Sequence, residues 1–151
     1  MKKLIFVVII TVFGFNIASN AQCINEKLSY PIYKQGAALV DQFDTQGQEI
    51  VRIEYDLVFT SKESFRNLSA DWEYTIVGFG DDGVKDLDVK VYEYDDLLEK
   101  WSLITEDAST ESFALVTVKP TKDALYKVEV IVYSFNEGYD VARYGLMYVH
   151  D

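Results

Sequence analysis

Apolar and polar residues alternate in segment after segment of this 151-residue chain, and this alternation limits the folds open to it. A period of two places successive side chains on opposite faces of a β-strand. Segment 50–59 (IVRIEYDLVF) carries the pattern most fully, with apolar residues set against charged ones: Ile53, Tyr55, Leu57 and Phe59 against Arg52, Glu54 and Asp56. This segment predicts a strand with one buried face.

Similar segments follow, separated by turn-forming stretches such as EDAST, KPTKD and NEGYD. They cover residues 72–79, 98–105, 111–118, 125–135 and 141–149, and one more strand carries an inward set of Leu87, Val89 and Val91. About seven or eight short strands at this spacing predict an all-β fold, namely an antiparallel β-sandwich of the jelly-roll type.

One region departs from the period of two. Segment 35–44 (QGAALVDQFD) has near-helical spacing, and Gly47 follows it as a stop signal. We expect this helix to lie in a short N-terminal extension, residues 22–50. The extension would pack on a single sandwich domain formed by residues 51–151.

The first 21 residues have the features of an export signal. Lys2 and Lys3 precede an apolar run over residues 4–15, and Ser19 and Ala21 are small residues at the −3 and −1 positions of a cleavage site. The run is too short to span a membrane, and no later segment is long and apolar enough to do so. We therefore predict an exported protein, periplasmic or extracellular, without a transmembrane segment.

Cys23 is the only cysteine, so no intrachain disulfide can form. Cleavage after Ala21 would leave Cys23 as the second residue of the exported chain. A lipid anchor at Cys23 is the alternative to a free thiol. Gln22 and Asn20 disfavour this alternative, because lipoprotein signals carry other residues at these positions.

Acidic residues outnumber basic ones by 25 to 14, which gives a net charge of −11. Loss of Lys2 and Lys3 with the leader would bring the net charge to −13. Repulsion of phosphate groups opposes binding to nucleic acid or to anionic lipid. The expected partner is therefore a protein or a polysaccharide.

The inventory of catalytic groups is short. His150 is the only histidine and the penultimate residue, where chain ends usually fray, and Cys23 has no histidine near it in the sequence. We predict no catalytic residue and expect a non-catalytic module with a binding or accessory role. Two alternatives stay open, a small hydrolase with paired carboxylates and a structural component of the cell envelope.

Acidic residues gather in segment 81–96 (DDGVKDLDVKVYEYDD). Asp86 and Asp88 are two residues apart and share one face of a predicted strand, while Asp81 and Asp82 lie in the loop before it. Calcium takes six to eight oxygen ligands, and a glycine-containing loop beside paired acids can supply them. Asp81, Asp82, Asp86 and Asp88 are therefore candidate calcium ligands. The alternative is that they form the solvated face of a strand.

Aromatic residues offer a second candidate site. The chain has 11 tyrosines, and Trp101 in LLEKWSLIT shares a face with an acidic neighbour, which predicts partial exposure. Flat aromatic faces bind sugar rings and peptide side chains. Trp101, Tyr92 and Tyr94 are the candidate ligand-binding residues. Alternatively, these aromatic residues pair across strands and only stabilise the sheet.

Four segments resemble strands of the bacterial pre-peptidase C-terminal domain, a secreted β-sandwich often appended to extracellular peptidases. They are DLDVKVYEYDD (86–96), FALVTVKP (113–120), LYKVEVIVY (125–133) and YGLMYV (144–149). The resemblance implies a β-sandwich, but the family's accessory role to an enzyme does not carry over, because this chain contains no peptidase. Because some members of this family bind calcium, it also implies Asp86 and Asp88 as ligands. The chain lacks the glycine usual after the acidic strand, since Asp95, Asp96 and Leu97 stand there.

Overall fold

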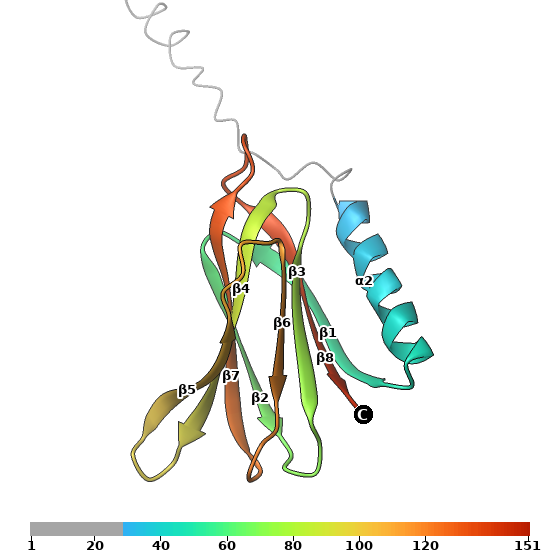
Figure 1. Ribbon diagram of the computed structural model, residues 1–151. Coiled ribbons are helices and arrows are strands. Elements are labelled where there is room, and N and C mark those ends of the chain that lie inside the picture. The colour runs from blue at the N-terminus through green and yellow to red at the C-terminus, as the bar shows by residue number, and fades with distance from the viewer. Residues whose placement is uncertain (1–28) are drawn as a thin grey trace, which may run out of the picture.

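Two four-stranded antiparallel sheets pack face to face in the computed structural model, and one helix lies on the outside of the first sheet (Figure 1). The structure describes residues 29–151, so the predicted leader and Cys23 lie outside the described residues. The elements are α2 (Ser29–Thr45), β1 (Glu49–Val58), β2 (Ser61–Leu68), β3 (Tyr74–Gly80), β4 (Val84–Asp95), β5 (Lys100–Asp107), β6 (Phe113–Val118), β7 (Ala124–Phe135) and β8 (Ala142–His150).

The strand order is that of a jelly roll. Sheet A has the order β1-β8-β3-β6 and sheet B the order β2-β7-β4-β5, with antiparallel pairing throughout. The neighbouring strands include four antiparallel pairs, namely β1/β8, β2/β7, β3/β6 and β4/β5. This pairing is that of a jelly roll, which consists of two Greek keys. The predicted all-β sandwich of the jelly-roll type is confirmed.

The main core lies between the two sheets, where alternate residues of each strand face inward. The expected inward set on β4, Leu87, Val89 and Val91, is fully buried there. It packs with the inward residues of β7 and β8, among them Val128, Val130, Leu146 and Tyr148. The period of two in the sequence therefore identified the correct buried face of β4.

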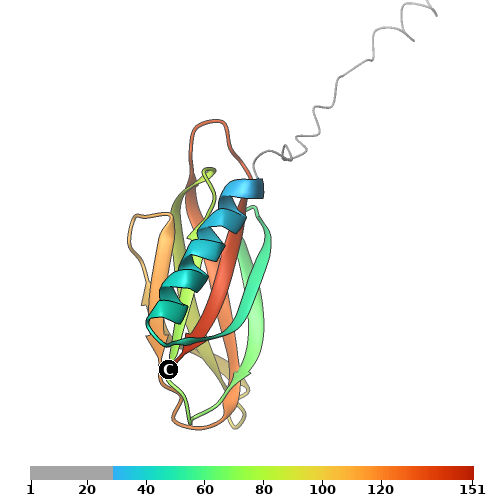
Figure 2. The same ribbon diagram turned by 90° about the vertical axis from the view of Figure 1, so that its right-hand side faces the viewer.

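Helix α2 covers the outer face of sheet A (Figure 2). Its residues Ile32, Leu39 and Phe43 form a second core with outward residues of β3 and β8, including Phe79 and Met147. The helix is longer than the predicted segment 35–44, because it begins at Ser29, with Pro31 in the first turn, where proline needs no amide partner.

The end of α2 agrees with the sequence. The helix ends at Thr45, and Gly47 follows with φ of 76°, a conformation that glycine adopts readily. Within residues 29–151, no helix has the length and hydropathy needed to cross a membrane.

Strand β2 was not predicted, because its inward positions are polar except for Leu68 at its end. Lys62 Nζ contacts Asp56 Oδ2 at 2.9 Å, and Ser64 Oγ donates to Glu54 Oε1 at 2.9 Å. The charged side of β1 therefore points toward β2 at an open edge of the sandwich, and its apolar side faces the helix. Phe59, expected in the buried set of β1, lies beyond the end of the strand and is 66% exposed.

Candidate ligand-binding face

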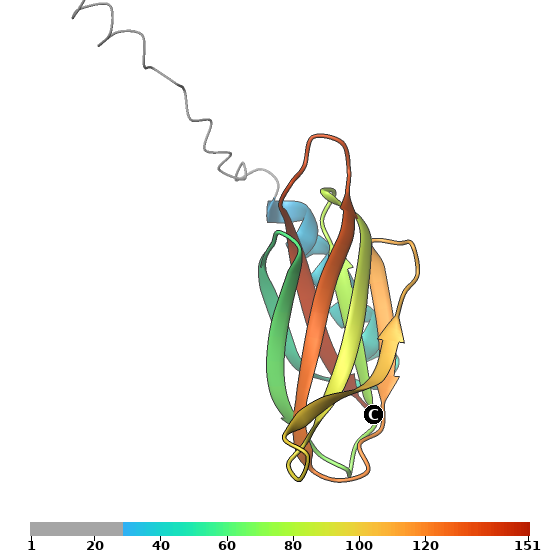
Figure 3. The same ribbon diagram turned by 90° about the vertical axis from the view of Figure 1, so that its left-hand side faces the viewer.

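The two outer faces of the sandwich differ. Helix α2 covers the outer face of sheet A, whereas that of sheet B has no such cover among the described residues (Figures 2 and 3). Exposed large apolar residues collect on the outer side of sheet B and on the β4–β5 hairpin: Phe65, Leu97, Leu98, Leu103, Ile104, Leu125 and Tyr133. A concentration of exposed apolar residues on one face marks an interaction surface.

Trp101 lies at the centre of an aromatic cluster on this face. Its ring centroid is 5.0 Å from that of Tyr94, its paired residue on β4, and 5.7 Å from that of Phe65 on β2. Two strands separate β2 from β5 in the sheet, and β5 reaches Phe65 because its first half curls across the outer face (Figure 3). A bulge in the β4–β5 pairing after Val91 accompanies this curl.

Lys127 of β7 lies beneath this cluster. Its Nζ is 4.5 Å from the centre of the Tyr92 ring and 5.7 Å from that of Trp101, and it donates to Glu63 Oε1 at 2.9 Å. The hydrogen bond to Glu63 raises the pKa of Lys127, so the lysine stays charged at neutral pH.

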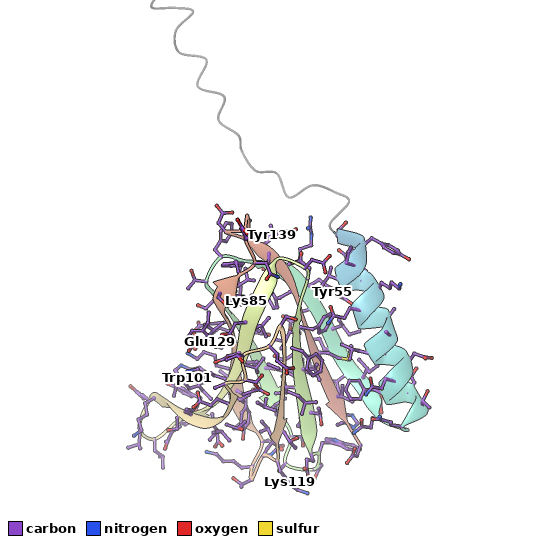
Figure 4. All side chains as sticks on the ribbon, turned by 45° about the horizontal axis from the view of Figure 1, so that its top comes forward. Tyr55, Lys85, Trp101, Lys119, Glu129 and Tyr139 are labelled. Atoms are coloured by element: carbon purple, nitrogen blue, oxygen red, sulfur yellow. The ribbon has the colours of Figure 1, made fainter. Side chains whose placement is uncertain are left out.

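Tyr92 is held by a hydrogen bond as well as by its contact with Lys127. Its hydroxyl donates to Glu129 Oε2 at 3.1 Å. Burial, and then this hydrogen bond, raise the pKa of Tyr92, so the hydroxyl stays neutral. Figure 4 shows Trp101 and Glu129 together on the side of the molecule away from the helix, while Tyr55 lies beside the helix. The predicted residues Trp101, Tyr92 and Tyr94 therefore lie together.

Three members of this face were missed in the sequence. Phe65 and Glu63 belong to the unpredicted strand β2, and Lys127 belongs to a predicted strand but was read only as a strand residue. The single aromatic residue in the polar segment SKESFRNL was the available signal for Phe65.

Asp81 and Asp82 hold the β3–β4 turn. Asp81 Oδ1 accepts a hydrogen bond from the Gly83 amide at 2.9 Å, and its Oδ2 accepts one from the Arg143 amide at 3.1 Å. Asp82 is exposed, and its carbonyl accepts from Asn136 Nδ2 at 2.9 Å. Asp81 therefore ties the turn to β8.

Asp86 and Asp88 lie on β4, and Asp88 is only 4% exposed. Burial, followed by the charges of Asp86 and Asp107, raises the pKa of Asp88. Asp86 Oδ1 is buried without a hydrogen-bond partner in the described part of the chain. The solvated-face alternative is thus wrong for Asp88, whose carboxylate is buried.

The structure does not gather the four aspartates into one group of candidate ligands. Among residues 29–151, no group of three or more His, Cys, Asp or Glu side chains is arranged to hold a metal ion. Calcium needs six to eight oxygen ligands, and the Asp81 oxygens already accept backbone hydrogen bonds. Calcium binding stays a prediction of the sequence.

His150 is held in place, contrary to the expectation that it frays. It ends β8, its ring centroid lies 4.2 Å from that of Trp72, and its side chain is 12% exposed. The ring packs against Trp72 and Tyr74, and Glu49 Oε2 lies 3.9 Å from Nε2. The pairing of β8 with both β1 and β3 keeps this chain end ordered.

No family model and no curated protein matches the chain. Several solved structures are similar to this chain at low sequence identity. The pre-peptidase C-terminal domain of a collagenase from Bacillus anthracis is 9% identical, with a TM-score of 0.49 over 64% of this chain and 87% of that one.

Two other solved structures illustrate the range of similar proteins. A periplasmic inhibitor of g-type lysozyme from Aeromonas hydrophila is 7% identical, with a TM-score of 0.41 over 69% of this chain and 86% of that one. A CBM4 structure is 12% identical, with a TM-score of 0.39 over 70% and 79%.

Proposed function

We propose that this protein is an exported, non-catalytic binding module, and that it binds a protein or polysaccharide ligand through the outer face of sheet B around Trp101. One observation carries the proposal: the helix covers one outer face of the sandwich, while the other presents the cluster of Trp101, Tyr94 and Phe65. Export rests on the features of residues 1–21.

The contacts around Trp101 support binding better than catalysis. Lys127 is paired with Glu63, and Tyr92 is paired with Glu129, so these polar groups are held by each other. Fixed aromatic rings with anchored charges between them form a rigid surface, which lowers the cost of ordering on binding. Such a surface accepts sugar rings or peptide side chains.

The hydrolase alternative lacks comparable support. It needs two acids in one cleft, one of which is held protonated by burial. Burial does raise the pKa of Asp88. At 4% exposure, however, this carboxyl has almost no surface through which a substrate could reach it.

The two tryptophans allow a direct test. The variant Trp72→Phe leaves Trp101 as the only fluorescent indole, and Trp101→Phe leaves Trp72, which lies beside His150. Both variants are titrated with soluble polysaccharides and with peptides. We expect ligand-dependent fluorescence changes in Trp72→Phe alone. Changes confined to Trp101→Phe would assign binding to the other site and contradict the proposal.

A further inference from the structure

Two leucines stand at the tip of the β4–β5 hairpin. Leu97 is 94% exposed and Leu98 is 61% exposed, in a connection where polar residues are usual. Figure 1 shows this hairpin leaning away from the two sheets, so that its tip projects from the sandwich. Adjacent leucines at a projecting tip form an exposed apolar knob, unlike single apolar residues scattered on a surface.

The knob is held in one shape. Asp95 Oδ1 accepts hydrogen bonds from the amides of Leu97 at 2.9 Å and Leu98 at 3.0 Å. Glu99 follows in the left-handed conformation, with φ of 49°, and leads into β5. A preorganised turn loses little conformational entropy when it binds, which favours its use as an anchor.

Carboxylates without an ion pair surround the leucines. Segment 95–100 (DDLLEK) contains three acids and one lysine. None of Asp95, Asp96 and Glu99 forms an ion pair with a cation in the described part of the chain. The tip therefore combines an apolar centre with an unpaired negative rim.

We propose that this tip docks into an apolar cleft, rimmed by lysine or arginine, on another protein. Branched aliphatic side chains lack the flat face that sugar rings stack on, which disfavours a polysaccharide here. The acidic rim opposes insertion into anionic lipid, and a net charge of −11 opposes docking on a second copy of this chain. A cationic protein complements both parts of the tip.

The inference deepens the proposed function, because it names the partner class for the end of sheet B where Trp101 lies. It is tested by panning a phage-displayed library of small folded domains, each with randomised residues in and around a surface cleft, on the immobilised full chain. The variants are Leu97→Ser/Leu98→Ser, Asp96→Asn/Glu99→Gln and Trp101→Ala. The matched control is Leu115→Ser, which changes an exposed leucine on β6.

We expect the enriched domains to carry apolar residues in the cleft and lysine or arginine at its rim. Binding should fall more than tenfold in Leu97→Ser/Leu98→Ser and stay unchanged in Leu115→Ser. It should fall in Asp96→Asn/Glu99→Gln at low salt, with a smaller effect at high salt, because salt screens exposed charges. Circular dichroism of each variant confirms that the fold is retained.

Several outcomes would overturn the inference. Enriched domains without basic residues at the cleft, or binding that persists in Leu97→Ser/Leu98→Ser, would show that the tip is not part of the binding site. If Trp101→Ala still abolished that binding, the proposed function would stand while the inference failed. If neither the tip variants nor Trp101→Ala lost binding, both the proposed function and this inference would be overturned. Self-association abolished by Leu97→Ser/Leu98→Ser, measured by analytical ultracentrifugation, would assign the tip to a second copy instead.

Discussion

The Nζ atom of Lys127 lies 4.5 Å from the centre of the Tyr92 ring, and these residues are direct cross-strand partners on β7 and β4. The pair forms the floor on which Trp101 rests, since the same Nζ is 5.7 Å from the Trp101 ring. Lys127 therefore contacts both Tyr92 and Trp101 through cation–π interactions, and it links Trp101 to the sheet beneath it.

Loss of this cation should weaken the fold. Lys127→Met keeps the apolar stem but removes the contacts with Tyr92, Trp101 and Glu63, and we expect a loss of about 1 kcal/mol in the free energy of unfolding. Urea denaturation measures it. The control Lys119→Met removes an exposed ion pair of 3.7 Å with Glu73 and should have less effect. Equal losses in the two variants would contradict the account.

The β4–β5 hairpin contains a strained residue. Glu99 has φ of 49°, which costs a residue with a Cβ roughly 1 kcal/mol or more, whereas glycine adopts this conformation freely. Glu99→Gly should stabilise the fold by about 0.5 kcal/mol, after allowance for the greater freedom of glycine in the unfolded chain. Glu137→Gly, at a residue without positive φ, should be neutral or destabilising. A lower melting temperature for Glu99→Gly would show that its side chain stabilises the turn.

The buried carboxyl of Asp88 should make stability depend on pH. Its pKa is raised in the folded state, so the protonated form favours folding. This contribution is fully present below the unfolded pKa of 3.8 and is lost as the pH rises through the folded value. Asp88→Asn should therefore melt a few degrees higher than wild type at pH 7, with a smaller difference near pH 3.

The same melts test calcium. Asp82→Asn, at an exposed residue, is the control and should show little change. Each protein is melted in EDTA and in millimolar calcium, with magnesium for comparison. If calcium raised the melting temperature of wild type and Asp88→Asn abolished that rise, Asp88 would be a calcium ligand. Its ionised form would then stabilise the fold, contrary to our expectation.

Close packing of the helix depends on Gly36. A Cβ at this position would collide with the hydroxyl of Tyr55 and lie 3.4 Å from Phe79 Cζ. Gly36→Ala should therefore destabilise the protein by about 1–3 kcal/mol, although alanine is the better helix former. Adding Tyr55→Phe removes the colliding hydroxyl and should recover part of the loss. Additive effects in this double-mutant cycle would contradict the contact.

Sequence patterns predicted the fold well where the buried face of a strand is apolar. They located β4 through Leu87, Val89 and Val91, because these positions face the main core. They missed β2, whose inward residues Lys62 and Ser64 bond to charged residues of β1. The period of two detects an apolar face, and a strand at a polar edge lacks one.

The candidate site was predictable only in part. Trp101, Tyr92 and Tyr94 were found because they are aromatic residues near one another in the sequence. Phe65 joins Trp101 only through the curl of β5 across the sheet, which is a property of the tertiary fold. The turn role of Asp81 had a local signal, since the Asp-Asp-Gly sequence is typical of side-chain-capped turns.

The central claim is that the outer face of sheet B binds the ligand. The most direct test compares the dissociation constants of Trp101→Ala and Trp72→Ala for the tightest ligand found among the polysaccharides and peptides screened. We predict a loss of at least tenfold, about 1.4 kcal/mol, for Trp101→Ala and wild-type affinity for Trp72→Ala. Wild-type affinity in Trp101→Ala would contradict the claim and move the site away from this face.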